Sequence, residues 1–136
     1  MRLGERLAEL LPLPGLVAFY GDLGAGKTAL VRGMGRALGA EHVTSPTFTI
    51  VHEYATKPPL IHIDAYRLAD GDALYDVGFA DYLKQNALLV VEWAELVEDA
   101  LPRQRLNIRI QGSGEEPRTL TLEAAGERYE RTVERL

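Results

Sequence analysis

The sequence predicts a three-layer α/β/α domain whose mostly parallel central sheet carries antiparallel strands at its C-terminal end. Buried-strand patterns alternate with helical patterns through the first two-thirds of the 136 residues, which is typical of a parallel sheet covered by helices. The last third instead shows two segments of period-two alternation around a glycine-rich turn, which indicates a hairpin that extends the sheet. This length fits one domain, and we expect residues 1–136 to form it.

The first elements form a strand, a loop and a helix. Leucines at helical spacing over residues 3–11 predict a short amphipathic helix that ends at a pair of prolines. Residues 16–20 are an apolar run that predicts a buried strand running into Gly21. Residues 27–38 then show helical periodicity, and Gly39 is the expected C-terminal cap of that helix.

The remaining elements follow from the same patterns. A helix is expected around residues 76–84, and a charged final helix begins at Glu127. Further strands are predicted over residues 48–52, 60–64, 87–93, 106–110 and 120–124.

The composition disfavours several classes of protein. A hydrophobic fraction of 46% and a charged fraction of 26% are those of an ordinary globular chain. The formal net charge of −5 disfavours a protein that grips nucleic acid mainly by charge. The absence of cysteine excludes disulfides, a thiolate nucleophile and cysteine-based metal sites. The apolar runs are far shorter than the roughly 18 residues of a membrane span, so we expect a soluble, cytoplasmic protein without a signal peptide or a membrane partner.

Residues 21–28, GDLGAGKT, fit the phosphate-binding loop pattern GxxxxGK[ST]. The predicted strand before them and the helix after them are the context that this pattern requires. The glycines let backbone N–H groups turn towards phosphates, and the helix N-terminus adds partial positive charge. A chance glycine-rich turn is the alternative, which the flanking elements disfavour. Lys27 is expected to reach the β- and γ-phosphates, and the Thr28 hydroxyl to bind Mg²⁺. The residues expected to contact the phosphates are Asp22, Leu23, Gly24, Ala25, Gly26, Lys27, Thr28 and Ala29.

Two acidic residues end predicted strands and are candidates for the metal and water site. Sites of this type need a carboxylate at the end of a neighbouring strand. Asp64 ends the strand at residues 60–64, and Glu92 follows the more continuously apolar run at residues 87–91. Either acid could bind Mg²⁺, activate water or simply end a strand. We favour a functional role for both and leave the division between them open.

Residues 44–49, TSPTFT, place four hydroxyl groups around Pro46 between the first long helix and the next strand. In a nucleotide hydrolase, such a segment can fold over the γ-phosphate and its metal in one nucleotide state. Ser45, Thr47 and Thr49 are therefore candidate switch residues. A loop with local hydroxyl-to-backbone hydrogen bonds is an equally good interpretation of the spacing.

Other polar residues have simpler interpretations. His42, His52 and His62 lack the spacing of a metal site, so we assign no zinc, and we expect His62 to be packed or hydrogen-bonded within its strand. Arg67 follows Asp64 closely enough to approach a phosphate or a partner, although pairing with a local carboxylate is as good an interpretation. Between residues 70 and 99, the chain has a single base and eight acids, which predict a solvated face that could steer a basic partner: Asp70, Asp72, Asp76, Asp81, Glu92, Glu95, Glu98 and Asp99.

Taken together, the motifs resemble one family. The phosphate loop is followed, in that family's order, by SPTF at residues 45–48, Glu53-Tyr54, HIDAYR at residues 62–67 and Glu92-Trp93. On these motifs the chain resembles the TsaE (YjeE) family over roughly residues 16–102. The combination is far more specific than the phosphate loop alone.

The resemblance implies a bacterial ATPase needed to form N6-threonylcarbamoyladenosine at position 37 of tRNAs that read codons beginning with A. It implies ATP and Mg²⁺ as cofactors and weak hydrolysis by the protein alone. It also implies TsaD and TsaB as partners: that pair carries the transfer, and ATP hydrolysis allows repeated turnover. Transfer RNA would be reached indirectly, through the complex.

Carried over to this sequence, the resemblance gives each motif a role. Lys27 and Thr28 would hold the phosphates and Mg²⁺, and residues 45–49 would be the first switch. Asp64 and Glu92 would complete the metal and water site. The Trp93 side chain would lie beside the reacting groups. The sequence departs from the family at Ala29, where a second Thr is common, and at Ala94, where Pro is common.

Two other functions are compatible with the phosphate loop. A small-molecule or nucleoside kinase needs a second pocket and usually a mobile lid, and no insertion long enough for a separate lid domain is evident. A nucleotide-gated binding module with negligible turnover would use ATP only to change its affinity for a partner. A GTPase is disfavoured because the sequence has no NKxD motif.

Overall fold

The structure is a computed structural model that describes residues 2–21, 24–40, 50–112 and 119–136. Two of the expected phosphate-loop residues, Asp22 and Leu23, lie outside the described residues. The three expected switch residues, Ser45, Thr47 and Thr49, lie outside them as well.

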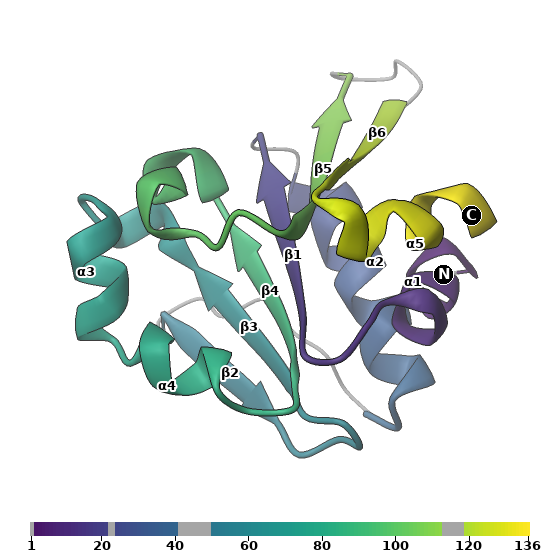
Figure 1. The fold of residues 1–136 in the computed structure, drawn as a ribbon, viewed down its shortest axis with the longest axis horizontal. Helices are drawn as coiled ribbons and strands as arrows, with labels where there is room; N and C mark the ends of the chain where they lie inside the picture. Colours follow the sequence, from purple (N-terminus) through teal and green to yellow (C-terminus); the bar gives the residue numbers. More distant parts are fainter. Residues whose placement is uncertain (1, 22–23, 41–49, 113–118) are drawn as a thin grey trace.

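A six-stranded sheet in the order β2-β3-β4-β1-β5-β6 forms the centre of the fold (Figure 1). The four inner strands are parallel to one another, and the two edge strands, β2 and β6, are antiparallel to their neighbours. The carboxyl ends of β1, β3 and β4 therefore lie together along one end of the sheet, which we call the carboxyl edge. The strands are β1 (Gly15–Tyr20), β2 (Val51–Tyr54), β3 (Leu60–Asp64), β4 (Leu88–Glu92), β5 (Arg105–Gln111) and β6 (Thr119–Ala125).

Helices cover both faces of this sheet (Figure 1). The α-helices are α1 (Arg2–Leu10), α2 (Gly24–Ala37), α3 (Gly71–Asp76), α4 (Phe79–Leu83) and α5 (Glu130–Arg135). Helices α1 and α2 pack on one face and contribute to one hydrophobic cluster, whereas α3 and α4 contribute to a second cluster on the other face. Short 3₁₀ helices lie at η1 (Ala65–Arg67), η2 (Ala94–Leu96), η3 (Glu98–Ala100) and η4 (Glu127–Tyr129).

The central strand β1 shows why the fold has three layers. All six of its residues are buried. Val17 and Phe19 belong to the cluster shared with α1 and α2, and Leu16, Ala18 and Tyr20 belong to the opposite cluster. Side chains of a strand alternate between faces, so an uninterrupted apolar strand needs a cover on each side. The expected α/β/α class with a mostly parallel sheet is confirmed.

The structure corrects two predicted elements. The strand expected over residues 48–52 begins later, at β2 (Val51–Tyr54), and is antiparallel to β3, while residues 48 and 49 lie outside the described part. The helix expected around residues 76–84 begins later, as α4, and a separate short helix that was not predicted, α3, precedes it. Gly78, with φ of 97°, separates them, because a left-handed backbone conformation cannot continue a right-handed helix. Among the described helices, none combines the length and apolar character that crossing a membrane requires.

Gly4 sets the close approach of α1 to α2, and its replacement tests this packing. A Cβ at Gly4 would lie 2.3 Å from the carbonyl oxygen of Leu30, which is backbone and cannot move aside freely. Overpacking typically costs about 1–3 kcal/mol, against a gain of about 1 kcal/mol in helix propensity. Because the clash is with backbone, we expect the upper half of this range to apply, so that Gly4→Ala lowers the free energy of unfolding by about 1–2 kcal/mol in urea titrations. The control Glu9→Ala, on the exposed side of α1, should change it by less than about 0.5 kcal/mol. Equal stability of the two variants would contradict this account.

Candidate functional site

The candidate site begins where β1 ends. Gly21, directly after β1, has φ of 95°, a conformation that favours glycine, and α2 starts at Gly24. The expected phosphate contacts Gly24, Ala25, Gly26, Lys27, Thr28 and Ala29 all lie in the first two turns of this 14-residue helix. The side chain of Thr28 lies outside the described part of the structure. The N-terminus of α2 therefore lies at the carboxyl edge of the sheet, where its partial positive charge attracts anions.

Lys27 is buried at this edge, with 2% of its surface exposed. Its Nζ donates a hydrogen bond of 2.8 Å to the Gly21 carbonyl and lies 3.9 Å from Glu92 Oε1. The same ammonium lies over the Trp93 ring, 4.8 Å from the ring centroid. A buried ammonium needs compensation of this kind because desolvation is costly. The arrangement fixes a positive charge between the start of α2 and the end of β4.

Glu92 ends β4 and faces Lys27 from the neighbouring strand. It is buried, and its Oε2 lies 2.7 Å from Nε2 of His62 on β3. Burial on its own raises the pKa of Glu92, but the hydrogen bond from His62 and the electrostatic attraction of His62 and Lys27 outweigh burial and lower the pKa below the usual glutamate value. Glu92 is therefore a carboxylate at neutral pH, and because a carboxylate only accepts hydrogen bonds, Nε2 of His62 is the donor.

Asp64 lies at the end of β3, directly beside Glu92, since the two residues are register partners in the parallel pair. It is partly exposed, and its Oδ1 accepts a hydrogen bond of 3.0 Å from the Tyr66 backbone N–H, which caps η1. This bond orients the carboxyl group at the sheet edge. In residues 2–21, 24–40, 50–112 and 119–136, no group of three acidic, His or Cys side chains is arranged to hold a metal ion. A metal here would need further oxygen ligands, which a hydroxyl group and nucleotide phosphates can supply.

The side chain of Trp93 lies beside Lys27. Trp93 directly follows β4, has a left-handed backbone with φ of 59° and ψ of 42°, and packs against the hydrophobic cluster that contains Leu89 and Val91. Its ring lies 5.0 Å from the ring of Tyr66 and against Lys27. A non-glycine residue in this conformation is strained, and such residues cluster at functional sites.

The sequence predicted that some site residues lie close together, but two contacts of the site were not predicted. Lys27, Asp64 and Glu92 lie at the same sheet edge, as their positions at element ends predicted. Glu95 was expected only as part of an acidic face, yet its Oε2 accepts a hydrogen bond of 3.0 Å from the Gly21 backbone N–H. His62 was expected to be packed or hydrogen-bonded, which it is, but its partner Glu92 could not be foreseen from spacing.

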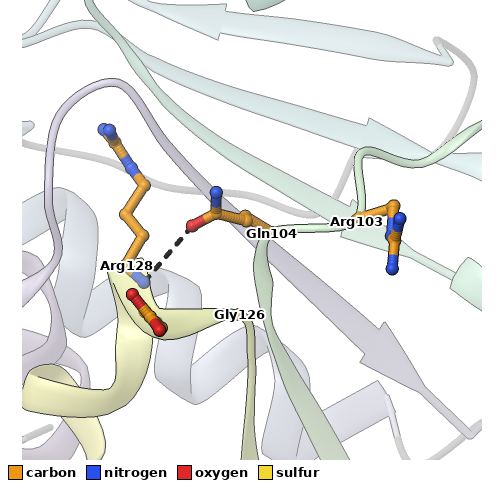
Figure 2. A pocket seen from close by; sticks show the side chains of 5 residues that line it. Arg103, Gln104, Gly126 and Arg128 are labelled. Atoms are coloured by element: carbon orange, nitrogen blue, oxygen red, sulfur yellow. Dashed lines mark hydrogen bonds between the residues drawn. The ribbon is translucent and has the colours of Figure 1, made fainter.

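A hollow in the surface lies at the opposite end of the sheet, next to the amino end of β5. It is lined by Arg103, Gln104, Gly126, Glu127 and Arg128. Figure 2 shows the side chains of Arg103 and Arg128 extending in different directions from Gln104, whose Oε1 accepts a hydrogen bond of 3.3 Å from the Arg128 backbone N–H. The two guanidinium groups do not converge as they would around one anionic ligand.

The strand order, the glycine-rich turn after β1 and the acids that end its neighbouring strands define a P-loop NTPase-like α/β fold. The sequence profile of the family described as "Threonylcarbamoyl adenosine biosynthesis protein TsaE" matches residues 1–120. The chain belongs to the TsaE family.

Similar proteins are found in several bacteria. A Bacillus subtilis protein named "tRNA threonylcarbamoyladenosine biosynthesis protein TsaE" is 41% identical over 134 residues, which cover 96% of this chain and 84% of that protein. A Streptomyces coelicolor protein of the same name is 43% identical over 136 residues, covering 93% of this chain and 91% of that protein. The crystal structure of Bacillus subtilis YdiB is similar with a TM-score of 0.77 and 36% identity, covering 98% of this chain and 84% of that one.

The lowered pKa of Glu92 predicts a dependence of stability on pH. Because the pKa of Glu92 is lower in the folded than in the unfolded chain, the unfolded chain binds more protons near the carboxyl pKa, and stability falls on acidification. We expect the free energy of unfolding of the wild type to fall more steeply between about pH 6 and about pH 3 than that of Glu92→Gln. Urea titrations in EDTA without nucleotide measure both slopes. Parallel slopes would contradict the assigned environment of Glu92.

Proposed function

We propose that this protein binds and hydrolyses ATP in the presence of Mg²⁺, and that it acts with TsaD and TsaB in the formation of tRNA N6-threonylcarbamoyladenosine at position 37. The observation that carries the proposal is the buried pair of Lys27 and Glu92 at the start of α2, with Nζ and Oε1 3.9 Å apart. The pair combines a cation for phosphates with an ionised carboxylate beside the place where the terminal phosphate would react.

The phosphates are expected at the N-terminus of α2. Backbone N–H groups of the loop and of the first turn would donate to them, and Lys27 would reach the β- and γ-phosphates. Its Nζ hydrogen-bonds the Gly21 carbonyl but lies at 3.9 Å from Glu92, too far for a hydrogen bond. The ammonium therefore has donor capacity left for a phosphate oxygen.

Glu92 is the residue that we propose to orient and polarise the attacking water. Its lowered pKa keeps it ionised, so it can always accept a hydrogen bond from water. A carboxylate of low pKa is a weak proton acceptor, so its contribution lies in orienting water and in electrostatics. The burial of Glu92 strengthens that effect because the surroundings screen it little.

Asp64 and Thr28 are the residues that we propose to hold Mg²⁺. Asp64 is partly exposed at the sheet edge, and the Tyr66 N–H fixes only one of its carboxylate oxygens. By contrast, Glu92 faces His62 with Oε2 and Lys27 with Oε1, which disfavours it as a direct ligand and suits it to water. The ion would neutralise charge that develops between the β- and γ-phosphates.

The biological role is proposed from the family. The relatives from Bacillus subtilis and Streptomyces coelicolor carry names that refer to tRNA threonylcarbamoyladenosine biosynthesis. We propose that ATP hydrolysis lets the TsaD–TsaB pair, which transfers the threonylcarbamoyl group, turn over repeatedly in the cytoplasm. The net charge of −5 supports contact with tRNA through these partners rather than directly.

Two variants separate binding of ATP from its hydrolysis. Lys27→Ala removes the cation at the phosphates, and we expect ATP affinity and turnover to fall together, by about tenfold or more. Glu92→Gln keeps the shape of the side chain but removes its charge, so ATP should still bind while turnover falls about 100-fold. Phosphate release and Trp93 fluorescence measure turnover and binding, each with and without the TsaD–TsaB pair.

The pair should raise wild-type turnover, which we expect to be weak for the protein alone. Wild-type binding and hydrolysis in Lys27→Ala would contradict the site. Undiminished hydrolysis in Glu92→Gln would move the water-orienting role to Asp64. Transfer of label from ATP to an acceptor other than water would favour a kinase, whereas tight binding with no hydrolysis even in the complex would favour a nucleotide-gated module.

A further inference from the structure

His62 is an unusual residue for its position in the sheet. It lies in the interior of β3 with 1% of its surface exposed, and its neighbours along the same face include Leu60, which is fully buried. On the adjacent strands it is the register partner of Val90 and of His52. A buried imidazole costs free energy unless its polar atoms are satisfied, so an aliphatic residue would suit packing better.

The two ring nitrogens of His62 differ in their contacts. Nε2 donates to Glu92 Oε2 at 2.7 Å, but Nδ1 is buried and has no hydrogen-bond partner among the described residues. The fold thus tolerates an unpaired polar atom to keep the other nitrogen against Glu92. The contact with Glu92 is therefore the feature that explains a histidine at residue 62.

That contact constrains the Glu92 carboxylate. A glutamate side chain has three rotatable bonds, so a single attraction would leave it several orientations. With Oε2 held by His62, Oε1 is directed to Lys27, 3.9 Å from its Nζ, and so to the end of the sheet where α2 begins. A rigid carboxylate loses less entropy when it orients a water for reaction.

We propose that His62 is a positioning residue for ATP hydrolysis, which acts by holding Oε2 of Glu92 so that Oε1 faces the reacting water. The proposal rests on the hydrolytic role given to Glu92 above. It assigns His62 no contact with the nucleotide, so substitution at residue 62 should change the rate of hydrolysis and leave ATP affinity almost unchanged.

The first test replaces the donor nitrogen. His62→Leu removes it, whereas His62→Gln keeps an N–H donor near the position of Nε2. We expect kcat to fall about 10- to 100-fold in His62→Leu and to recover most of that loss in His62→Gln. ATP affinity from Trp93 fluorescence should stay within about twofold of wild type in both. If His62→Leu does not fold, His62→Asn, whose amide is too short to reach Glu92, replaces it.

The matched control is His52→Leu. His52 is the register partner of His62 on β2, and its ring stacks on Tyr54 with centroids 4.3 Å apart. The His52→Leu substitution removes an imidazole from the same part of the sheet without removing a partner of Glu92. We expect wild-type kcat in this variant, with folding of every variant checked by thermal unfolding.

The second test asks whether His62 acts through Glu92. In the Glu92→Gln background, His62→Leu should slow single-turnover hydrolysis of radiolabelled ATP by less than about twofold, because the carboxylate that it positions is already gone. Equal loss in both backgrounds would mean a general structural effect and would overturn the proposal, as would wild-type kcat in His62→Leu. Both of those outcomes leave hydrolysis by the wild type intact. A failure of the proposed function would give a different result. In that case the wild type itself would not hydrolyse ATP, alone or with its partners.

Discussion

The buried ammonium of Lys27 constrains the arrangement of the site. A charge with 2% exposure is tolerated only with partners, and here the Gly21 carbonyl, the Glu92 carboxylate and the Trp93 ring surround it. Glu92 is buried in turn and needs the donor that His62 provides. Each group compensates the next, so the polar cluster is stable as a set and costly to break at any member.

Sheet topology brings this set together. Because β1 lies between β4 and β5, Lys27 in the first turns of α2 lies beside the end of β4, and the parallel register of β3 with β4 places Asp64 next to Glu92. The apolar interiors of these strands hold the polar ends rigidly at one edge. The sheet thus fixes the positions of the site residues, and the polar side chains at the strand ends are the groups that can bind or react with a ligand.

Local patterns were sufficient to predict the layers of the fold and the positions of Lys27 near the start of α2 and of Asp64 and Glu92 at strand ends. Helix α3 and its end before Gly78 were missed, because a helix of six residues is too short for its apolar period to stand out from the sequence. The partner of His62 could not be predicted either, since it depends on which strands pair and in which register. Similarly, the strand pattern gives no signal for the left-handed backbone of Trp93 at the end of β4.

We propose that ATP hydrolysis involving Glu92, rather than ATP binding alone, supports repeated formation of the modified nucleoside. The most direct measurement counts the modified tRNA formed per TsaD–TsaB pair, with excess tRNA and threonylcarbamoyl adenylate and saturating ATP, in the presence of wild type or Glu92→Gln. We expect many rounds with the wild type and no more than a single round with Glu92→Gln. Repeated rounds at the wild-type level with a variant that binds ATP but does not hydrolyse it would contradict the account.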